Sequence, residues 1–263
     1  MTRLLFTCLF CLFAATVSRA ASAPAARAAT SDEVMVLIGA VKKYTSDVNR
    51  WAYTQTAIMR DNKGKTKSEI VVRFDPSEPP EKQWTPILLD GKPPTARDLN
   101  RYRRRGTQAH AESDVPGTRR KYALGELIQF EGVKLVSEDA SQYVFEIPLR
   151  KENNNRFPPE KFLVLARVNK AAQTLATVEV RLREAFRQKL VVKVKSGEGT
   201  LDFETVSPEH APTLTSIRGD ATVSVVFVNV GGTYELKRKD FKRVKPYDDR
   251  FEVQIGEMKA LDF

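Results

Sequence analysis

Apolar and polar residues alternate along most of the second half of the chain, which is the pattern of half-buried strands. Short turns such as Asn169-Lys170 and Gly197-Glu198-Gly199 separate the alternating runs. Consecutive strands joined by short turns predict an antiparallel meander with one buried face and one face in water. The apolar members of the runs are Tyr143, Phe145, Ile147 and Leu149; Phe162, Val164, Ala166 and Val168; Val178, Val180 and Leu182; Leu190, Val192 and Val194; Leu201 and Phe203; and Phe251, Val253 and Ile255.

One segment breaks the alternation, because Val223 to Val230 is almost continuously apolar. Such a run predicts a strand that is covered on both faces or lies in the middle of the sheet. The Gly231-Gly232 pair that follows predicts a hairpin turn, after which Thr233 to Leu236 would form the next strand.

A helix is predicted before the meander. Thr30 and Glu33 have the spacing of a capping box, in which each side chain accepts a hydrogen bond from the other residue's amide. An apolar stripe with helical spacing follows, so we expect a helix that packs one face against a sheet. The stripe consists of Val34, Leu37, Ile38, Val41 and Tyr44.

A β-hairpin is predicted after this helix. Its two strands, Trp51 to Arg60 and Ser68 to Phe74, are rich in aromatic and β-branched residues. The turn between them is Asp61-Asn62-Lys63-Gly64, which has the composition of a tight hairpin connection.

The segment from about 75 to 123 departs from both patterns, because it is rich in proline. One regular piece is predicted within this insert: Thr95 can cap a helix with Asp98 three residues on, and the helix runs from Ala96 to Arg105. Gly106 is expected to end it in the left-handed conformation. The apolar stripe is narrow, so the helix should lie on a surface or over an opening. It consists of Ala96, Leu99 and Tyr102.

Residues 1–20 have the organisation of an export signal. Arg3 precedes an apolar stretch from Leu4 to Val17, and Ser18-Arg19-Ala20 forms a small-residue cleavage site. An Ala-rich run continues to Ala29, so cleavage as late as residue 29 remains open. The apolar stretch is shorter than the roughly 20 residues needed to cross a bilayer. We therefore expect a soluble periplasmic protein in which residues 30–263 form a single β domain.

Both cysteines, Cys8 and Cys11, lie within the export signal. The exported chain then has no thiol for a disulfide, a nucleophile or a thiolate metal site. Lipidation of either cysteine is disfavoured, because both stand early in the apolar stretch and lack the small residues that precede a lipoprotein cysteine.

The chain is basic, with 43 Lys and Arg against 33 Asp and Glu and a formal net charge of +10. Such a surplus favours anionic neighbours, which for an exported protein are lipid head groups or acidic envelope polymers; a merely soluble basic surface is the simpler alternative. Three arginines on one side of the predicted second helix could bind phosphate or carboxylate groups, although a solvated helix face would look the same. They are Arg101, Arg104 and Arg105.

Residues of known catalytic motifs are missing from the sequence. His110 and His210 are its only histidines, both in predicted loops, and neither a Gly-x-Ser-x-Gly nor a His-Glu-x-x-His motif accompanies them. We predict no catalytic site, no metal site and no cofactor. Basic residues between Lys237 and Lys245 are interrupted by Phe241 and Val244, but the export signal argues against a nucleic-acid partner.

The opening of the exported chain resembles the periplasmic lipoprotein-carrier superfamily of LolA-like and LolB-like proteins. Members begin with an amphipathic helix, followed by an aromatic-x-aromatic-x-Gln strand, a polar Gly-Lys turn and a strand that leads to an Arg-x-x-Pro corner. The matching residues are Trp51-Ala52-Tyr53-Thr54-Gln55, Asp61-Asn62-Lys63-Gly64-Lys65 and Ile70-Val71-Val72-Arg73-Phe74-Asp75-Pro76. This resemblance implies an incomplete β-barrel with helices as a lid over a hydrophobic cavity for acyl chains.

The leading hypothesis is a mainly β protein, with a long curved antiparallel sheet and two helices as a lid, that carries a lipid or lipoprotein acyl chain without catalysis. An envelope interaction module with a filled core, which binds a protein or an anionic polymer through the basic surface, is the alternative. An exported hydrolase is the least favoured reading. The predicted lining of the cavity is Trp51, Tyr53, Phe74, Trp84 and Tyr143.

Overall fold

The computed structural model describes residues 26–114, 127–151, 158–188, 192–225 and 228–250. The predicted export signal and the predicted strand from Phe251 to Ile255 lie outside these ranges. The helices are α1 (Ser31–Asp47) and α2 (Ala96–Asp114), with short 3-10 helices η1 (Val48–Arg50), η2 (Pro159–Lys161) and η3 (Asp248–Arg250). The strands are β1 (Arg27–Ala28), β2 (Trp51–Asp61), β3 (Thr66–Phe74), β4 (Trp84–Leu89), β5 (Lys134–Glu138), β6 (Gln142–Glu146), β7 (Phe162–Asn169), β8 (Thr174–Leu182), β9 (Phe186–Gln188), β10 (Val192–Glu204), β11 (Thr213–Val225) and β12 (Val228–Arg243).

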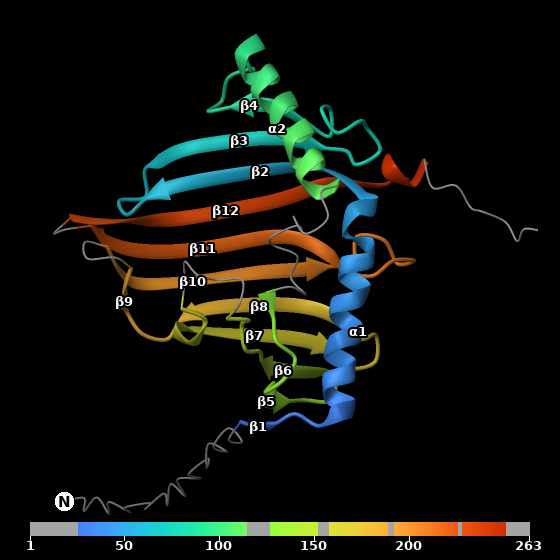
Figure 1. Cartoon of the computed structure of the whole chain (residues 1–263), viewed down its shortest axis with the longest axis vertical. Helices are drawn as coiled ribbons and strands as arrows, with labels where there is room; N and C mark the ends of the chain where they lie inside the picture. Colours follow the sequence, from blue (N-terminus) through green and yellow to red (C-terminus); the bar gives the residue numbers. More distant parts are fainter. Residues whose placement is uncertain (1–25, 115–126, 152–157, 189–191, 226–227, 251–263) are drawn as a thin grey trace, which may run out of the picture.

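The strands form a single 12-stranded sheet in the order β1-β5-β6-β7-β8-β10-β11-β12-β2-β3-β4, with β9 beside β10. Every described pairing is antiparallel. The sheet is not closed, because β1 and β4 stand at its two edges and no pairing among the described residues joins them. Both helices lie on the same face of the sheet (Figure 1). The predicted fold, an incomplete antiparallel barrel with two helices, is confirmed.

One line of paired residues crosses the sheet from β5 to β4, and all of its members are apolar. They point to the face that carries the helices, because side chains two residues apart on a strand share a face. Burial is deepest where α1 covers the line, and the members on β2 and β3 are only half-buried. The line consists of Leu135, Phe145, Ala166, Val178, Leu201, Ile217, Leu236, Ala57, Ile70 and Leu89.

Helix α1 covers the part of this face formed by β7 and β8. Leu37, Ala40 and Val41 are buried there in the main hydrophobic core, together with Phe145 of β6. Near the end of the helix, Tyr44 meets the ring of Phe203 edge-on at 5.0 Å between centroids. The predicted apolar stripe of the first helix is thus the stripe that packs on the sheet.

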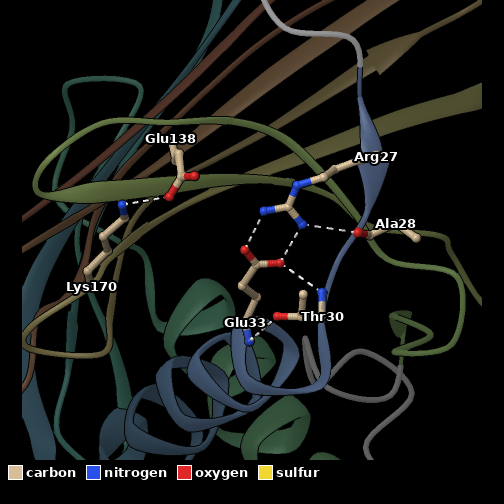
Figure 2. Close-up of polar contacts among 6 residues, drawn as sticks. All are labelled: Arg27, Ala28, Thr30, Glu33, Glu138 and Lys170. Carbon is tan, nitrogen blue, oxygen red and sulfur yellow. Dashed lines mark hydrogen bonds and ion pairs between the residues drawn. The ribbon is translucent and has the colours of Figure 1, made fainter.

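Arg27 ties β1 to the first turn of α1 (Figure 2). Its guanidinium donates two hydrogen bonds to the Glu33 carboxylate, at 2.7 and 2.9 Å. The same carboxylate accepts the Thr30 amide at 2.7 Å, and the Thr30 hydroxyl accepts the Glu33 amide, which confirms the predicted capping box. The Arg27 hydrogen bonds are the main reason why the pKa of Glu33 is lowered to about 2.

The other end of α1 is anchored to β12. The Asp47 carboxylate accepts hydrogen bonds from the indole of Trp51, at 3.0 Å, and from the guanidinium of Arg243, which also lies over the Trp51 ring. Side-chain hydrogen bonds from Arg243 and Trp51 outweigh the effect of burial and lower the pKa of Asp47. Contacts at both ends therefore fix how α1 lies across the sheet.

Two predicted turns are wrong. Gly197-Glu198-Gly199 lies within β10, which pairs with β8 and β11 along this stretch. Gly231-Gly232 lies within β12, and the predicted single strand from Val223 to Val230 is divided between the paired ends of β11 and β12. At Gly232 a Cβ would lie 1.9 Å from the carbonyl oxygen of Arg60 on β2, so glycine serves a close backbone approach there.

The proline-rich insert contains more regular structure than predicted. Besides the helix, it contributes β4, which pairs with β3 and includes Pro86. Proline has no amide hydrogen to donate, and an edge strand tolerates this because one of its sides has no strand to pair with. The predicted Thr95 cap is confirmed, since the Asp98 carboxylate accepts the Thr95 amide at 3.1 Å and the Thr95 hydroxyl accepts the Asp98 amide at 3.3 Å.

Replacing Glu33 by Gln is expected to make the free energy of unfolding depend less on pH under acidic conditions. Gln at this position can still accept the Thr30 amide, so the change removes the charge and leaves the cap. In the wild type the pKa of Glu33 is about 2 in the folded protein and 4.5 without its folded partners. As the pH falls, the unfolded chain therefore binds the proton before the folded protein does. The charged carboxylate therefore stabilises the fold above about pH 4.5, and this contribution disappears as the pH falls towards 2.

Urea unfolding of the wild type and of E33Q at pH 6 and pH 3 measures this difference. The gap in unfolding free energy between the two proteins should be larger at pH 6. A gap that does not change with pH would contradict the role given to the Arg27–Glu33 pair.

Candidate functional site

Helix α2 lies over the β2–β4 end of the sheet and packs against β4 (Figure 1). The predicted helix end at Gly106 is wrong, because the helix continues to Asp114. At Gly106 the helix touches the loop that precedes β4, where a Cβ would lie 2.2 Å from the carbonyl oxygen of Pro80. Gly106 therefore allows helix and loop to approach each other closely, which is a different use of glycine from a helix end.

A groove of about 260 Å³ lies between α2 and the helix-facing side of the sheet. Ala57 of β2 and Ile70 of β3 are paired and form its floor, and Tyr102 of α2 contributes to its wall. Tyr102, a member of the narrow apolar stripe of α2, thus faces the groove. The complete lining is Gln55, Ala57 and Met59 of β2, Ser68, Ile70 and Val72 of β3, Trp84 of β4, Tyr102 of α2 and Tyr234 of β12.

Met59 and Tyr234, which pair across β2 and β12, are the exposed members of this lining, and we call this end of the groove its mouth. These side chains are 52% and 36% exposed, although both are large and mostly apolar. Exposed apolar side chains around a concave apolar floor are typical of a ligand site.

Beyond Tyr234 the helix-facing side of the sheet carries no side chain at two successive paired positions. Gly219 of β11 pairs with Tyr234, and Gly199 of β10 pairs with Gly219. A Cβ at either glycine would contact only a backbone carbonyl oxygen of the next strand, at 3.5 Å for Gly199 and 3.4 Å for Gly219. We call these two positions the glycine floor, and it leaves free space beside the mouth of the groove.

An aromatic cluster adjoins the groove at Trp84, and we call this end, away from Met59, its inner end. The rings of Phe74 and Trp84 stack at 4.5 Å between centroids, and Tyr53 lies 5.1 Å from Phe74. Phe241, in an irregular stretch of β12, joins Tyr53 to Trp51 at 5.7 and 6.2 Å. Trp51 and Tyr53 are buried, and burial raises the pKa of the Tyr53 hydroxyl. The structure thus gathers four of the five residues predicted to line a cavity, and Trp84 lines the groove itself.

Tyr143 lies elsewhere, on β6 near the other edge of the sheet. It packs beside Phe145 at the margin of the core under α1, and the ammonium of Lys170 lies 4.3 Å from its ring centroid. Lys170 also donates to Glu138 at 2.8 Å (Figure 2). Tyr143 is therefore separate from the groove under α2, and its role in ligand binding stays a prediction.

The arginines of α2 are exposed. Arg101 is bound to Asp98 one turn earlier, at 2.8 Å, and Arg104 and Arg105 are in solvent. Arg103, which the sequence did not single out, lines a second hollow of about 410 Å³ between α2 and the loop before β4. The predicted role of Arg101, Arg104 and Arg105 in anion binding stays a prediction.

The opposite face of the sheet carries a hollow of about 710 Å³ with a different chemistry. Acidic and basic side chains alternate around it and bind one another, so it has no net preference for a cation or an anion. Its ion pairs include Arg60–Glu235, Arg181–Glu179 and Arg218–Asp202. Exposed pairs of this kind contribute little to stability individually, and we do not assign a site there.

The histidines do not form a catalytic arrangement with one another. The expected loop position of His110 is wrong, because it lies in α2, whereas His210 lies in the loop between β10 and β11 with its ring 5.4 Å from Trp51. Within the described ranges, no three His, Cys, Asp or Glu side chains gather as metal ligands would. No helix of the described part is both long enough and apolar enough to cross a bilayer.

Neither a protein-family model nor a curated protein matches the chain. A solved structure that is similar is that of a LolA superfamily protein from Nitrosomonas europaea, with a TM-score of 0.37 and 14% identity. The similarity covers 83% of this chain and 96% of that chain.

Replacing Gly106 by Ala is expected to loosen α2 from the sheet. Alanine favours a helix by about 1 kcal/mol over glycine, so an unconstrained position would gain stability. Here the added Cβ would collide with the Pro80 carbonyl, and we expect a net loss of about 1 kcal/mol or more. Thr107→Ala, at the exposed next position, is the matched control and should be close to neutral.

Chemical unfolding and amide hydrogen exchange of α2 measure both effects. Faster exchange in α2 of G106A alone is the expected result. A more stable G106A with unchanged exchange would show that helix and loop are not in contact.

Proposed function

We propose that this is a non-enzymatic periplasmic binding or carrier protein, and that the groove beneath α2 holds an acyl chain of a lipid or lipoprotein. The observation that supports it is the combination of an apolar floor, a helix over that floor, and a mouth with the exposed side chains of Met59 and Tyr234. The half-buried state of Ala57 and Ile70 means that the protein's own side chains leave this part of the sheet incompletely covered. An acyl chain would complete that coverage.

The size of the groove fits part of one chain. A methylene takes up about as much space as a water molecule, about 30 Å³, so a groove of about 260 Å³ holds about eight methylenes. Their burial contributes at most about 6 kcal/mol at ~0.8 kcal/mol each, which corresponds to tens of micromolar. A longer chain has further space over the glycine floor, because Gly199 and Gly219 present no side chain there.

Helix α2 would act as the lid. It rests on β4 and on the loop at Pro80 and presents only a narrow apolar stripe, so little apolar contact holds it down. Movement of α2 away from the sheet would open the groove along its length, which gives entry and release of a bulky ligand.

An envelope interaction module remains the alternative, in which Arg101, Arg104 and Arg105 bind an anionic polymer or a protein. Their exposure on α2 supports it. Different substitutions test the two functions. Acyl-chain binding depends on the floor of the groove, whereas partner binding depends on the exposed arginines of α2.

Ala57→Trp is expected to abolish acyl-chain binding, because the indole fills the floor of the groove. Ile58→Trp is the matched control: the neighbouring residue of the same strand points to the opposite face, so it should bind as the wild type does. The measurement is binding of a fluorescent fatty acid, together with native mass spectrometry of lipid that copurifies from the envelope. We expect affinity to fall at least tenfold in A57W. Equal binding by both variants, or binding lost only when the three arginines of α2 are changed to glutamine, would contradict the carrier function.

We further propose that export removes residues 1–20 and leaves Arg27 in the mature protein. The hydrogen bonds of Arg27 to Glu33, and of the Ala29 amide to the Val133 carbonyl at 3.1 Å, favour cleavage after Ala20 over cleavage as late as Ala29. N-terminal sequencing of the protein from the envelope should find a start at Ala21. A start at Thr30 would contradict this assignment, since it removes β1 entirely.

A further inference from the structure

Arg238 brings a positive charge to the inner end of the groove. It lies on β12 opposite Gln55 of β2, on the helix-facing side of the sheet, and it is half-buried. Its Nε donates a hydrogen bond to the Gln55 side-chain oxygen at 3.2 Å. Gln55 lines the groove. The guanidinium of Arg238 therefore lies directly behind a lining residue, next to the space that a ligand would occupy.

The described neighbours of this guanidinium are neutral. It stacks over the ring of Tyr53, 4.4 Å from the centroid, and no carboxylate among the described residues forms an ion pair with it. Arg243, five residues further along the same strand, binds the carboxylate of Asp47. Among the described residues, the helix-facing side of β12 thus has one arginine with an anionic partner, Arg243, and one without, Arg238.

Arg238 retains hydrogen-bonding capacity. A guanidinium has five N–H donors in a planar fork that matches a carboxylate or a phosphate. Within the described part of the chain, only its Nε makes a hydrogen bond to the protein. Its two Nη atoms can therefore bind the two oxygens of an anion, and such charge-assisted pairs are stronger than neutral hydrogen bonds.

The charge acts on the aromatic residues around it. Burial raises the pKa of Tyr44, Tyr53 and Tyr234, and the positive charge of Arg238 opposes that rise at each of them. Tyr53 belongs to the aromatic cluster at the inner end, and Tyr234 stands at the mouth. Arg238 is thus close enough to act electrostatically on a residue near each end of the groove.

Building on the proposed function, we infer that the ligand is an amphiphile with an anionic head group, the carboxylate of a free fatty acid or the phosphate of a lipid, and that Arg238 binds this head. The chain then runs over Ala57 and Ile70 towards Met59. From Gln55 to Met59 the strand spans about 13 Å at ~3.3 Å per residue. An acyl chain joined to a protein by ester or amide bonds brings no negative charge, so the geometry favours a free anionic lipid over a lipoprotein.

The test compares palmitic acid, its methyl ester and palmitoyl lysophosphatidic acid as competitors of a fluorescent fatty acid. The wild type should bind at least one of the two anionic lipids about tenfold or more tightly than the ester. Arg238→Gln should lose this preference and keep the affinity for the ester, which also shows that the variant is folded. Arg238→Lys should retain part of the preference. Lys239→Gln, which removes a charge from the opposite face of the same strand, should behave as the wild type.

The outcomes separate the head-group inference from the proposed function. Equal affinity of the wild type for acids and ester, or an unchanged preference in R238Q, would overturn the role of Arg238 and leave the acyl carrier intact. Absence of binding for all three competitors would overturn the carrier function as well. Inorganic phosphate alone should not displace the fluorescent probe at millimolar concentration; efficient displacement would mean that the site takes a free anion and not a lipid head.

Discussion

The structure depends on covering one apolar face of a sheet that is wider than the helices available to cover it. The apolar line from Leu135 to Leu89 runs through almost the whole width of the sheet, and burial of such a face is the main driving force of the fold. Helix α1 covers the part on β7 and β8 with three buried apolar residues and is fixed at both ends. Helix α2 has only a narrow apolar stripe, so the face formed by β2 and β3 is left half-covered. The groove is a direct result of this difference between the two helices.

Small residues decide how closely the elements approach one another around the groove. Gly106 lets α2 lie against the carbonyl of Pro80, and Gly232 lets β12 approach the carbonyl of Arg60. Gly199 and Gly219 act differently, because they leave space where other strands present a side chain. Glycine thus allows close contacts of α2 and of the sheet, and it leaves the area beside the mouth of the groove without side chains.

Charge is distributed over the two faces of the sheet in different ways. On the face opposite the helices, acidic and basic side chains form ion pairs, as in Arg218–Asp202 and Arg60–Glu235. On the helix-facing side, Arg238 has an aromatic ring and an amide as its described partners. A guanidinium within a mostly apolar surface interacts more strongly with an anion than one in bulk water, because the local dielectric constant is lower. The proposed head-group site rests on this contrast between the two faces of the sheet.

The sequence by itself determined the features that arise from neighbouring residues. Alternation predicted several of the strands and their inner faces, although not where β10, β11 and β12 begin and end. The spacing of Thr30 and Glu33 and of Thr95 and Asp98 predicted where both helices begin. The gathering of Trp51, Tyr53 and Phe74 could also be predicted, because these residues share one face of the predicted hairpin. Trp84 joins them on β4, a strand that the sequence did not predict. The groove floor of Ala57 and Ile70 carried the same alternating signal, but this signal does not distinguish a half-covered residue from a core residue.

Only the tertiary structure decided the use of the glycines, the length of α2 and the position of Arg238 beside Gln55. A glycine in a turn and a glycine under a crossing strand look alike in sequence, because the atom that excludes a Cβ belongs to a distant residue such as Arg60 or Pro80. Arg238 and Gln55 are likewise far apart along the chain and meet through the pairing of β12 with β2. Contacts of this kind depend on which strands become neighbours, and local residue patterns do not contain that information.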